Sequence, residues 1–214
     1  MEWSLLSSMT DEDRRTLLAT CHRRRFARSE AVFREGDPAQ SLHLLAEGTV
    51  AVRVATPLGD VATLDVLAPG DVFGEQALIA EPSVRSATVV ALEQVQTLSL
   101  TREAFERLLA DHPGVLRLLV GALDARLRTT SRNLVDALYM PVEARVFRHL
   151  ARLGALYERR GSIPLTQDDL ASMAGTTRQS LNKVLRRAQE DGLVTLSRSR
   201  IAVIDPDGVA RRAR

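Results

Sequence analysis

Short alternating runs of apolar and polar residues, separated by turns, dominate the chain from Ala31 to Leu100. Successive side chains of a β-strand point to opposite faces of a sheet, so this alternation is typical of strands with one buried face. Such runs occur at 49–54, 61–67, 86–91 and 95–100, and the turn sequences around them are Gly36-Asp37, Glu47-Gly48, Leu58-Gly59-Asp60 and Pro69-Gly70-Asp71. Turns at this spacing predict a compact antiparallel roll or barrel.

The segment from Gly74 to Arg85 interrupts this rhythm, and the motifs Phe73-Gly74-Glu75 and Arg85-Ser86-Ala87 lie at its two ends. A glycine lets backbone approach a ligand, a carboxylate accepts from ribose hydroxyls, and arginine and serine donate to phosphate oxygens. These are the groups needed to hold a cyclic phosphodiester with its ribose. A turn followed by a solvated strand end would have the same sequence, so the pattern alone leaves both interpretations open. Within the strand pattern, the segment is predicted to be a ligand-holding excursion from the roll.

A long helix is predicted after the roll. Shorter helices capped by Thr10 and Thr101 flank the strands, and Pro113 then opens the longer one. Its apolar positions follow a four-three alternation, with Thr130 filling one gap: Leu116, Val120, Leu123, Leu127, Leu134 and Ala137. This is the a/d pattern of a coiled coil and favours a parallel homodimer. Packing of the helix on its own roll is the alternative.

Thr130 and the neighbouring Ser131 are the polar exceptions in this helix. Hydroxyl side chains in the middle of a helix lower its stability slightly. We therefore expect that they either set the register of the dimer or reach a ligand that lies against the seam.

The C-terminal third has the pattern of a helix-turn-helix. Pro141 begins a helix after a predicted hinge at 137–140, and Thr166 caps the next helix. Gly175 makes the turn, and Thr177 caps the last helix. One face of that helix is apolar, with Leu181, Val184, Leu185 and Ala188. The other face presents hydrogen-bond donors, namely Arg178, Gln179, Asn182, Lys183, Arg186 and Arg187.

A small hairpin is predicted after this helix. The runs 193–196 and 201–204 are joined by Ser197-Arg198-Ser199-Arg200, which makes the motif a winged helix-turn-helix with a basic wing. Helix pairs of this size also serve as packing elements only. The exposed donor face favours DNA binding through Thr177, Arg178, Gln179, Asn182, Lys183, Arg198 and Arg200.

The charge distribution supports this assignment. Residues 141–214 carry 14 Lys/Arg and 8 Asp/Glu, whereas residues 1–140 carry 15 and 19. Because this basic half coincides with a helical DNA-binding pattern, its charge indicates that it binds the phosphate backbone of a nucleic acid.

Several classes of protein are disfavoured by the composition. The lone Cys21 permits no disulfide within the chain, and the four histidines lack metal-ligand spacing, so no metal or bound cofactor is expected. No nucleophile or carboxylate pair has catalytic spacing, so we do not expect an enzyme. The absence of a long apolar run or a signal-peptide pattern predicts a cytoplasmic protein without membrane contact.

From Ala31 to Asp205 the order of roll, Gly-Glu to Arg-Ser cassette, dimer helix and winged motif resembles the cyclic AMP receptor protein and fumarate-nitrate regulator family of bacterial transcription factors. The resemblance implies that Gly74 and Glu75 bind ribose. It implies that Arg85, Ser86 and the Ala87 backbone bind the cyclic phosphate, and that Thr130 and Ser131 contact adenine, the serine from across the dimer.

The chain departs from the family pattern at two positions: Gln76 replaces an aliphatic residue of the cassette, and Gln179 replaces a base-reading glutamate. The cysteine cluster usual in the fumarate-nitrate branch is also lacking. The resemblance places the chain in the cyclic AMP receptor-like branch.

The expected fold is therefore α+β, with a jelly-roll-like cyclic-nucleotide-binding roll (1–112), a dimerisation helix (113–138) and a winged helix-turn-helix (139–214). The expected function is that of a homodimeric transcriptional regulator switched by cyclic AMP, with a palindromic operator and RNA polymerase as partners. One alternative is a regulator that binds DNA without ligand or with another effector. A second is a regulatory subunit that inhibits an enzyme and uses its C-terminal helices for protein contact.

Overall fold

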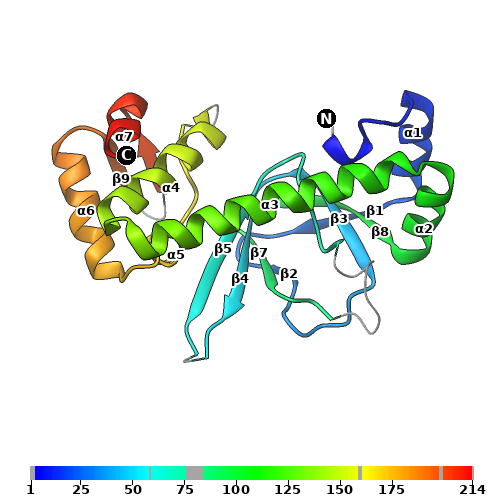
Figure 1. Cartoon of the computed structure of the whole chain (residues 1–214), viewed down its shortest axis with the longest axis horizontal. Coiled ribbons are helices and arrows are strands. Elements are labelled where there is room, and N and C mark those ends of the chain that lie inside the picture. Colours follow the sequence, from blue (N-terminus) through cyan, green and yellow to red (C-terminus); the bar gives the residue numbers. More distant parts are fainter. Residues whose placement is uncertain (1–2, 58, 76–83, 159–160, 198–199, 214) are drawn as a thin grey trace. The chain divides into compact units, whose positions relative to one another are not determined.

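The computed structural model describes residues 3–57, 59–75, 84–158, 161–197 and 200–213. They form two compact units, the first made of 1–54 with 65–129 and the second of 55–64 with 130–214. The helices are η1 (Ser4–Leu6), α1 (Asp11–Thr20), α2 (Arg102–Asp111), α3 (Gly114–Tyr139), α4 (Val142–Leu156), α5 (Gln167–Met173), α6 (Arg178–Glu190) and α7 (Pro206–Arg212) (Figure 1). The strands are β1 (His22–Phe26), β2 (Ala31–Phe33), β3 (Ser41–Glu47), β4 (Val50–Ala55), β5 (Val61–Leu67), β6 (Val72–Phe73), β7 (Thr88–Ala91), β8 (Val95–Thr101), β9 (Val194–Ser197) and β10 (Arg200–Val203).

The roll consists of two four-stranded sheets, ordered β1-β8-β3-β6 and β2-β7-β4-β5. The strand and turn prediction is confirmed, with ends that differ by one or two residues. β7, for example, begins at Thr88 and not at Ser86. β1 lies before the predicted roll. Four of its five residues are exposed, so it lacks the alternation that marks a strand, and its pairing with β8 defines it.

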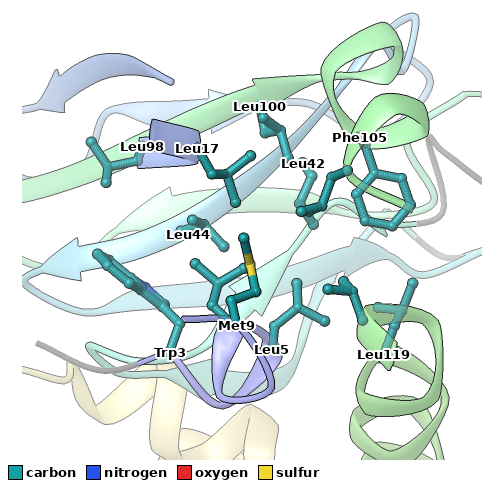
Figure 2. Close-up of a cluster of buried hydrophobic side chains, with 13 residues drawn as sticks. Trp3, Leu5, Met9, Leu17, Leu42, Leu44, Leu98, Leu100, Phe105 and Leu119 are labelled. Atoms are coloured by element: carbon teal, nitrogen blue, oxygen red, sulfur yellow. The ribbon is translucent and has the colours of Figure 1, made fainter. Parts of the chain in front are cut away.

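The first unit has two apolar cores because the sheet β1-β8-β3-β6 buries both of its faces. Adjacent strand residues point to opposite faces, so Leu44 and Leu45 of β3 serve different cores. One core lies between this sheet and the helices η1, α1, α2 and α3, and Figure 2 shows its sheet residues Leu42, Leu44, Leu98 and Leu100. The other core lies between the two sheets and contains Leu45, Phe73 and Val95 from the first sheet with Val50, Leu67, Val89 and Ala91 from the second.

The predicted caps of the flanking helices are confirmed. The Thr10 hydroxyl accepts from the Asp13 N–H at the start of α1, and the Thr101 hydroxyl accepts from the Ala104 N–H at the start of α2. Each contact satisfies one of the N–H groups that a helix leaves unpaired in its first turn.

The predicted hinge at 137–140 is shorter than expected. α3 stays helical to Tyr139, and the break is confined to Met140 and Pro141. Proline has no N–H to donate to the carbonyl of Ala137 four residues earlier, which ends the helix. The Arg145 guanidinium takes that place, because its Nη1 donates to the carbonyls of Ala137 and Met140, each at 3.0 Å.

The second unit contains the winged helix-turn-helix. Thr166 and Asp169 form a reciprocal capping box at the start of α5, and Thr177 caps α6. β9 and β10 form the wing, each displaced by one residue from its predicted range. The helix α7, which begins at Pro206 after its cap Asp205, was not predicted.

The tip of the β4–β5 hairpin belongs to this second unit. The Thr63 N–H donates to Ser172 Oγ at 2.6 Å, and Ser172 Oγ donates to the Val61 carbonyl at 3.3 Å. These bonds join residues 109 and 111 positions apart, and no sequence pattern indicated them.

Candidate functional site

Arg85 is the centre of the first candidate site, and its backbone is held by a neighbouring turn. The Arg85 N–H donates to the Asp37 carbonyl, and the Gly36 N–H donates to the Arg85 carbonyl, both at 2.9 Å. β7 begins three residues later at Thr88. The arginine therefore projects from a backbone fixed on both sides.

The guanidinium of Arg85 is buried, with 6% of the residue exposed. Nη1 donates to the Gly74 carbonyl and Nη2 to Ser41 Oγ, both at 3.2 Å, and the group lies 4.0 Å from the centre of the Phe33 ring. Nε is buried and has no hydrogen-bond partner among the described residues. Burial lowers the pKa of Arg85, and the charges of Asp37 and Glu75 partly offset that effect. A buried cation with a free donor is suited to an entering anion.

Gly74 is required by both its conformation and its surroundings. Its φ of +80° lies in the region that favours glycine. A Cβ atom there would lie 2.6 Å from Arg85 Nη1 and 3.1 Å from the Ser41 carbonyl oxygen. Any side chain at this position would displace the arginine.

Glu75 is paired with an arginine that was not predicted to belong to the site. Arg126 Nη1 lies 3.1 Å from Glu75 Oε1, and Arg126 Nη2 donates to the Val72 carbonyl at 3.1 Å. Glu75 is 5% exposed. Arg126 lies on α3 between other arginines, such as Arg128, and nothing in the sequence distinguishes it from them.

The structure brings Gly74, Glu75 and Arg85 together. Ser86 is exposed and Ala87 is buried. Thr130 and Ser131 are exposed on α3 and belong to the second compact unit. The roles of all seven residues in ligand contact stay predictions. Gln76, the departure within the cassette, lies outside the described residues.

The second candidate site is the outer face of α6. Leu181, Leu185 and Ala188 are fully buried against the rest of the unit. Thr177, Arg178, Gln179 and Lys183 are exposed, and Asn182 is half-buried. The amphipathic pattern of the helix is confirmed, although its base contacts stay a prediction.

Two of the basic residues near this face already have partners. Arg178 Nη1 lies 3.3 Å from Asp168 Oδ2, and both side chains are largely exposed. An exposed pair of this kind contributes little, so it does not prevent a base contact. In the wing, Arg200 Nη1 donates to Ser162 Oγ at 3.1 Å. Arg198 lies outside the described residues.

Arg145 joins the helix-turn-helix to the end of α3. Besides its two bonds to the α3 terminus, Nε donates to the Ala174 carbonyl at 2.8 Å and Nη2 to the Gly175 carbonyl at 3.1 Å. One side chain thus holds the turn before α6 and the break after α3. The sequence predicts the helix that begins at Pro141, but not this role of Arg145.

Comparisons with known proteins identify a domain around each site. Residues 23–112 match the cyclic nucleotide-binding domain, and residues 144–212 match the Crp-like helix-turn-helix domain. The chain is 30% identical over 195 residues to the CRP-like cAMP-activated global transcriptional regulator of Mycobacterium tuberculosis, covering 88% of this chain and 87% of the relative. The chain belongs to the CRP/FNR family of transcription factors. It is also 33% identical over 202 residues to the cyclic AMP receptor protein of Thermus thermophilus, covering 93% and 91% of the two chains.

Solved structures of similar regulators share the fold. The c-di-GMP responsive global regulator CLP of Xanthomonas campestris matches with a TM-score of 0.78 at 25% identity, covering 92% of this chain and 100% of that chain. A CRP-family regulator of Thermus thermophilus matches with a TM-score of 0.76 at 28% identity, covering 89% and 96%. The protein is thus a DNA-binding transcription regulator with a cyclic nucleotide-binding domain.

The described residues include neither a membrane span nor a metal site. No helix among them is long and apolar enough to cross a membrane. Within the same part of the chain, no group of three or more His, Cys, Asp or Glu side chains could hold a metal ion.

Proposed function

We propose that the protein is a homodimeric regulator whose binding to promoter DNA is controlled by a cyclic nucleotide, cyclic AMP. The observation that carries this proposal is the buried guanidinium of Arg85 beside Gly74 and Glu75, whose Nε has no hydrogen-bond partner in the part of the chain that the structure describes. A cyclic phosphodiester supplies the anion that this donor lacks. Two relatives named above are described as cAMP-activated or as a cyclic AMP receptor.

In this proposal each residue of the cassette contacts one part of the ligand. Arg85, Ser86 and the Ala87 backbone bind the phosphate, and Gly74 with Glu75 binds the ribose. Thr130 and Ser131 contact the adenine. Glu75 keeps its ion pair with Arg126 while it accepts from the ribose, because Arg126 already lies beside Glu75 in the structure.

The exposed apolar stripe of α3 supports the homodimer. Leu116, Val120, Leu127 and Leu134 are between 51% and 65% exposed, although leucine and valine stripes at a/d spacing are normally buried in a partner helix. Leu123 is half-buried against the apolar core.

We propose the same functional division of the chain as the sequence predicts, with a cyclic-nucleotide-binding roll at 1–112, a dimerisation helix at 113–138 and a winged helix-turn-helix at 139–214. RNA polymerase is the proposed protein partner on DNA.

A second candidate is control by another effector or by none. The Xanthomonas relative is named for its response to c-di-GMP. In this chain Glu75 is already neutralised by Arg126 without ligand. A regulator of this kind would have the same helix-turn-helix.

Titration calorimetry with cyclic AMP, cyclic GMP and c-di-GMP, followed by operator binding with each, tests the proposal. We expect cyclic AMP to bind and to change operator affinity, because an effector acts only by binding two conformations unequally. Binding of c-di-GMP alone would assign the second candidate. Operator affinity that none of the three ligands changes would refute control by a cyclic nucleotide.

Gln179 offers a test of base reading by α6. Glutamine suits adenine N6 and N7, whereas glutamate accepts from a cytosine amino group. We expect Gln179→Glu to shift preference at one base pair of each half-site towards C·G by about tenfold, since a bidentate pair discriminates by about 1–3 kcal/mol. Selection from a random DNA library measures the shift.

The matched control is Gln189→Glu, which makes the same change at an exposed position near the other end of α6. It should leave the selected sequence unchanged. Identical base preferences for wild type and Gln179→Glu would mean that this side chain reads no base.

A further inference from the structure

His43 lies behind the proposed phosphate site and is connected to Arg85 through hydrogen bonds. Its Nδ1 lies 3.2 Å from Thr97 Oγ1, and its Nε2 lies 3.3 Å from Ser41 Oγ. Ser41 Oγ in turn accepts from Arg85 Nη2 at 3.2 Å. His43 is 5% exposed and Thr97 is fully buried. The four side chains form one chain of contacts, which we call the Thr97–Arg85 relay.

Packing holds the imidazole in place. Its ring is stacked on Phe73 with 5.2 Å between centroids and 8° between planes, and Phe33 lies 5.8 Å away. Phe33 is also the ring against which the Arg85 guanidinium lies. The histidine and the arginine thus share an aromatic neighbour as well as a serine.

The donors and acceptors in the relay assign the proton on His43. Arginine can only donate, so Ser41 Oγ is an acceptor for Arg85. The Ser41 hydroxyl still has its own proton to donate, and the positive charge of Arg85 favours a lone pair of His43 Nε2, and not an N–H, on that side. In this arrangement, which the proposal below adopts, Nδ1 carries the ring proton and donates to Thr97 Oγ1.

We propose that His43 is a positioning residue, which orients the Ser41 hydroxyl so that Arg85 is held ready for a cyclic phosphodiester. The proposal rests on the proposed ligand function of Arg85. Fixing the arginine before binding reduces the entropy lost when the ligand enters. A neutral imidazole is required, because a protonated one would direct a second donor at Ser41.

The surroundings of His43 keep it neutral. Burial, with the charges of Arg85 and of Arg24 on β1, lowers its pKa from 6.5 to about 3. The ring therefore stays uncharged throughout the range in which an ordinary histidine titrates.

Nitrogen-15 NMR of the ligand-free protein tests the relay directly. We expect His43 to carry its proton on Nδ1 and to show no titration between about pH 5 and about pH 8. A proton on Nε2, or titration within this range, would overturn the proposal. This measurement needs no ligand, so it remains decisive if the proposed function fails.

Calorimetry with cyclic AMP tests the effect on binding. His43→Phe keeps the ring but removes both nitrogens, and we expect about tenfold weaker binding because the Ser41 hydroxyl loses its acceptor. His43→Gln, whose amide oxygen can accept from Ser41, should restore most of the affinity. Ser41→Ala should weaken binding similarly, and the double variant Ser41→Ala with His43→Phe should be no weaker than either alone.

The exposed His22 provides the control, since His22→Gln should bind as wild type. Equal loss in His43→Phe and His43→Gln would show that an acceptor for the Ser41 hydroxyl does not restore binding, which refutes the positioning role. Wild-type affinity in His43→Phe would refute it as well. If the wild type itself binds no cyclic nucleotide, the proposed function has failed, and the NMR result alone decides the relay.

Discussion

Arg85→Leu is expected to weaken cyclic-nucleotide binding by about a hundredfold or more while the protein stays folded. The substitution removes the buried guanidinium that faces the proposed phosphate. Charge-assisted hydrogen bonds contribute about 1.5–3 kcal/mol each, and the loss of two accounts for the expected change. Calorimetry with cyclic AMP measures it, and thermal unfolding reports whether the fold is intact.

Arg85→Lys distinguishes charge from geometry. Lysine keeps the positive charge but lacks the planar fork, so we expect an intermediate affinity. Arg23→Leu on the exposed strand β1 removes the same charge elsewhere and should bind as wild type. Wild-type affinity in Arg85→Leu would show that the phosphate site lies elsewhere.

The second large effect is expected at the seam of α3. Leu127→Glu with Leu134→Glu should convert the dimer to a monomer and abolish operator binding, because it places like charges in a dry interface. Leu127 is 65% and Leu134 61% exposed in the single chain, so the substitutions leave its core intact. Leu123 is less suitable, since it also packs on the core of the first unit. Sedimentation measures the oligomeric state.

Ala122→Glu with Ala125→Glu is the matched control. It adds the same charge to exposed positions of α3 outside the a/d seam and should leave the dimer intact. If the wild type sediments as a monomer with and without ligand, the coiled-coil interpretation is wrong.

Local physical rules explain which elements were predicted correctly. Thr10, Thr101, Thr166 and Thr177 cap helices as predicted, because a cap depends only on neighbours within one turn. The strands of the roll follow from alternation and turns. β1 was missed, because its exposed arginines carry no alternation and only pairing with β8 makes it a strand. α7 was missed as well, although Asp205 and Pro206 form an ordinary helix start.

The candidate site was likewise predicted only where local sequence is sufficient. Gly74, Glu75 and Arg85 were found from residue chemistry and order along the chain. Arg126, His43 and Ser41 were not assigned to the site, because their partners are distant in sequence: Glu75 lies 51 residues from Arg126, and Arg85 lies 44 from Ser41. The helix that begins at Pro141 was predicted, but the contact of its Arg145 with Gly175 spans 30 residues.

The sequence by itself determined the α+β class, the order of roll, long helix and winged helix-turn-helix, the candidate residues Gly74, Glu75 and Arg85, and the exposed donor face of α6. These follow from periodicity, caps and turns, which act over a few residues. Only the tertiary structure decided which groups meet: Arg126 with Glu75, Thr63 with Ser172, and His43 with Ser41 and Thr97. Such pairs depend on how strands and helices pack. The residues next to a side chain in the sequence do not indicate which distant side chain it will contact.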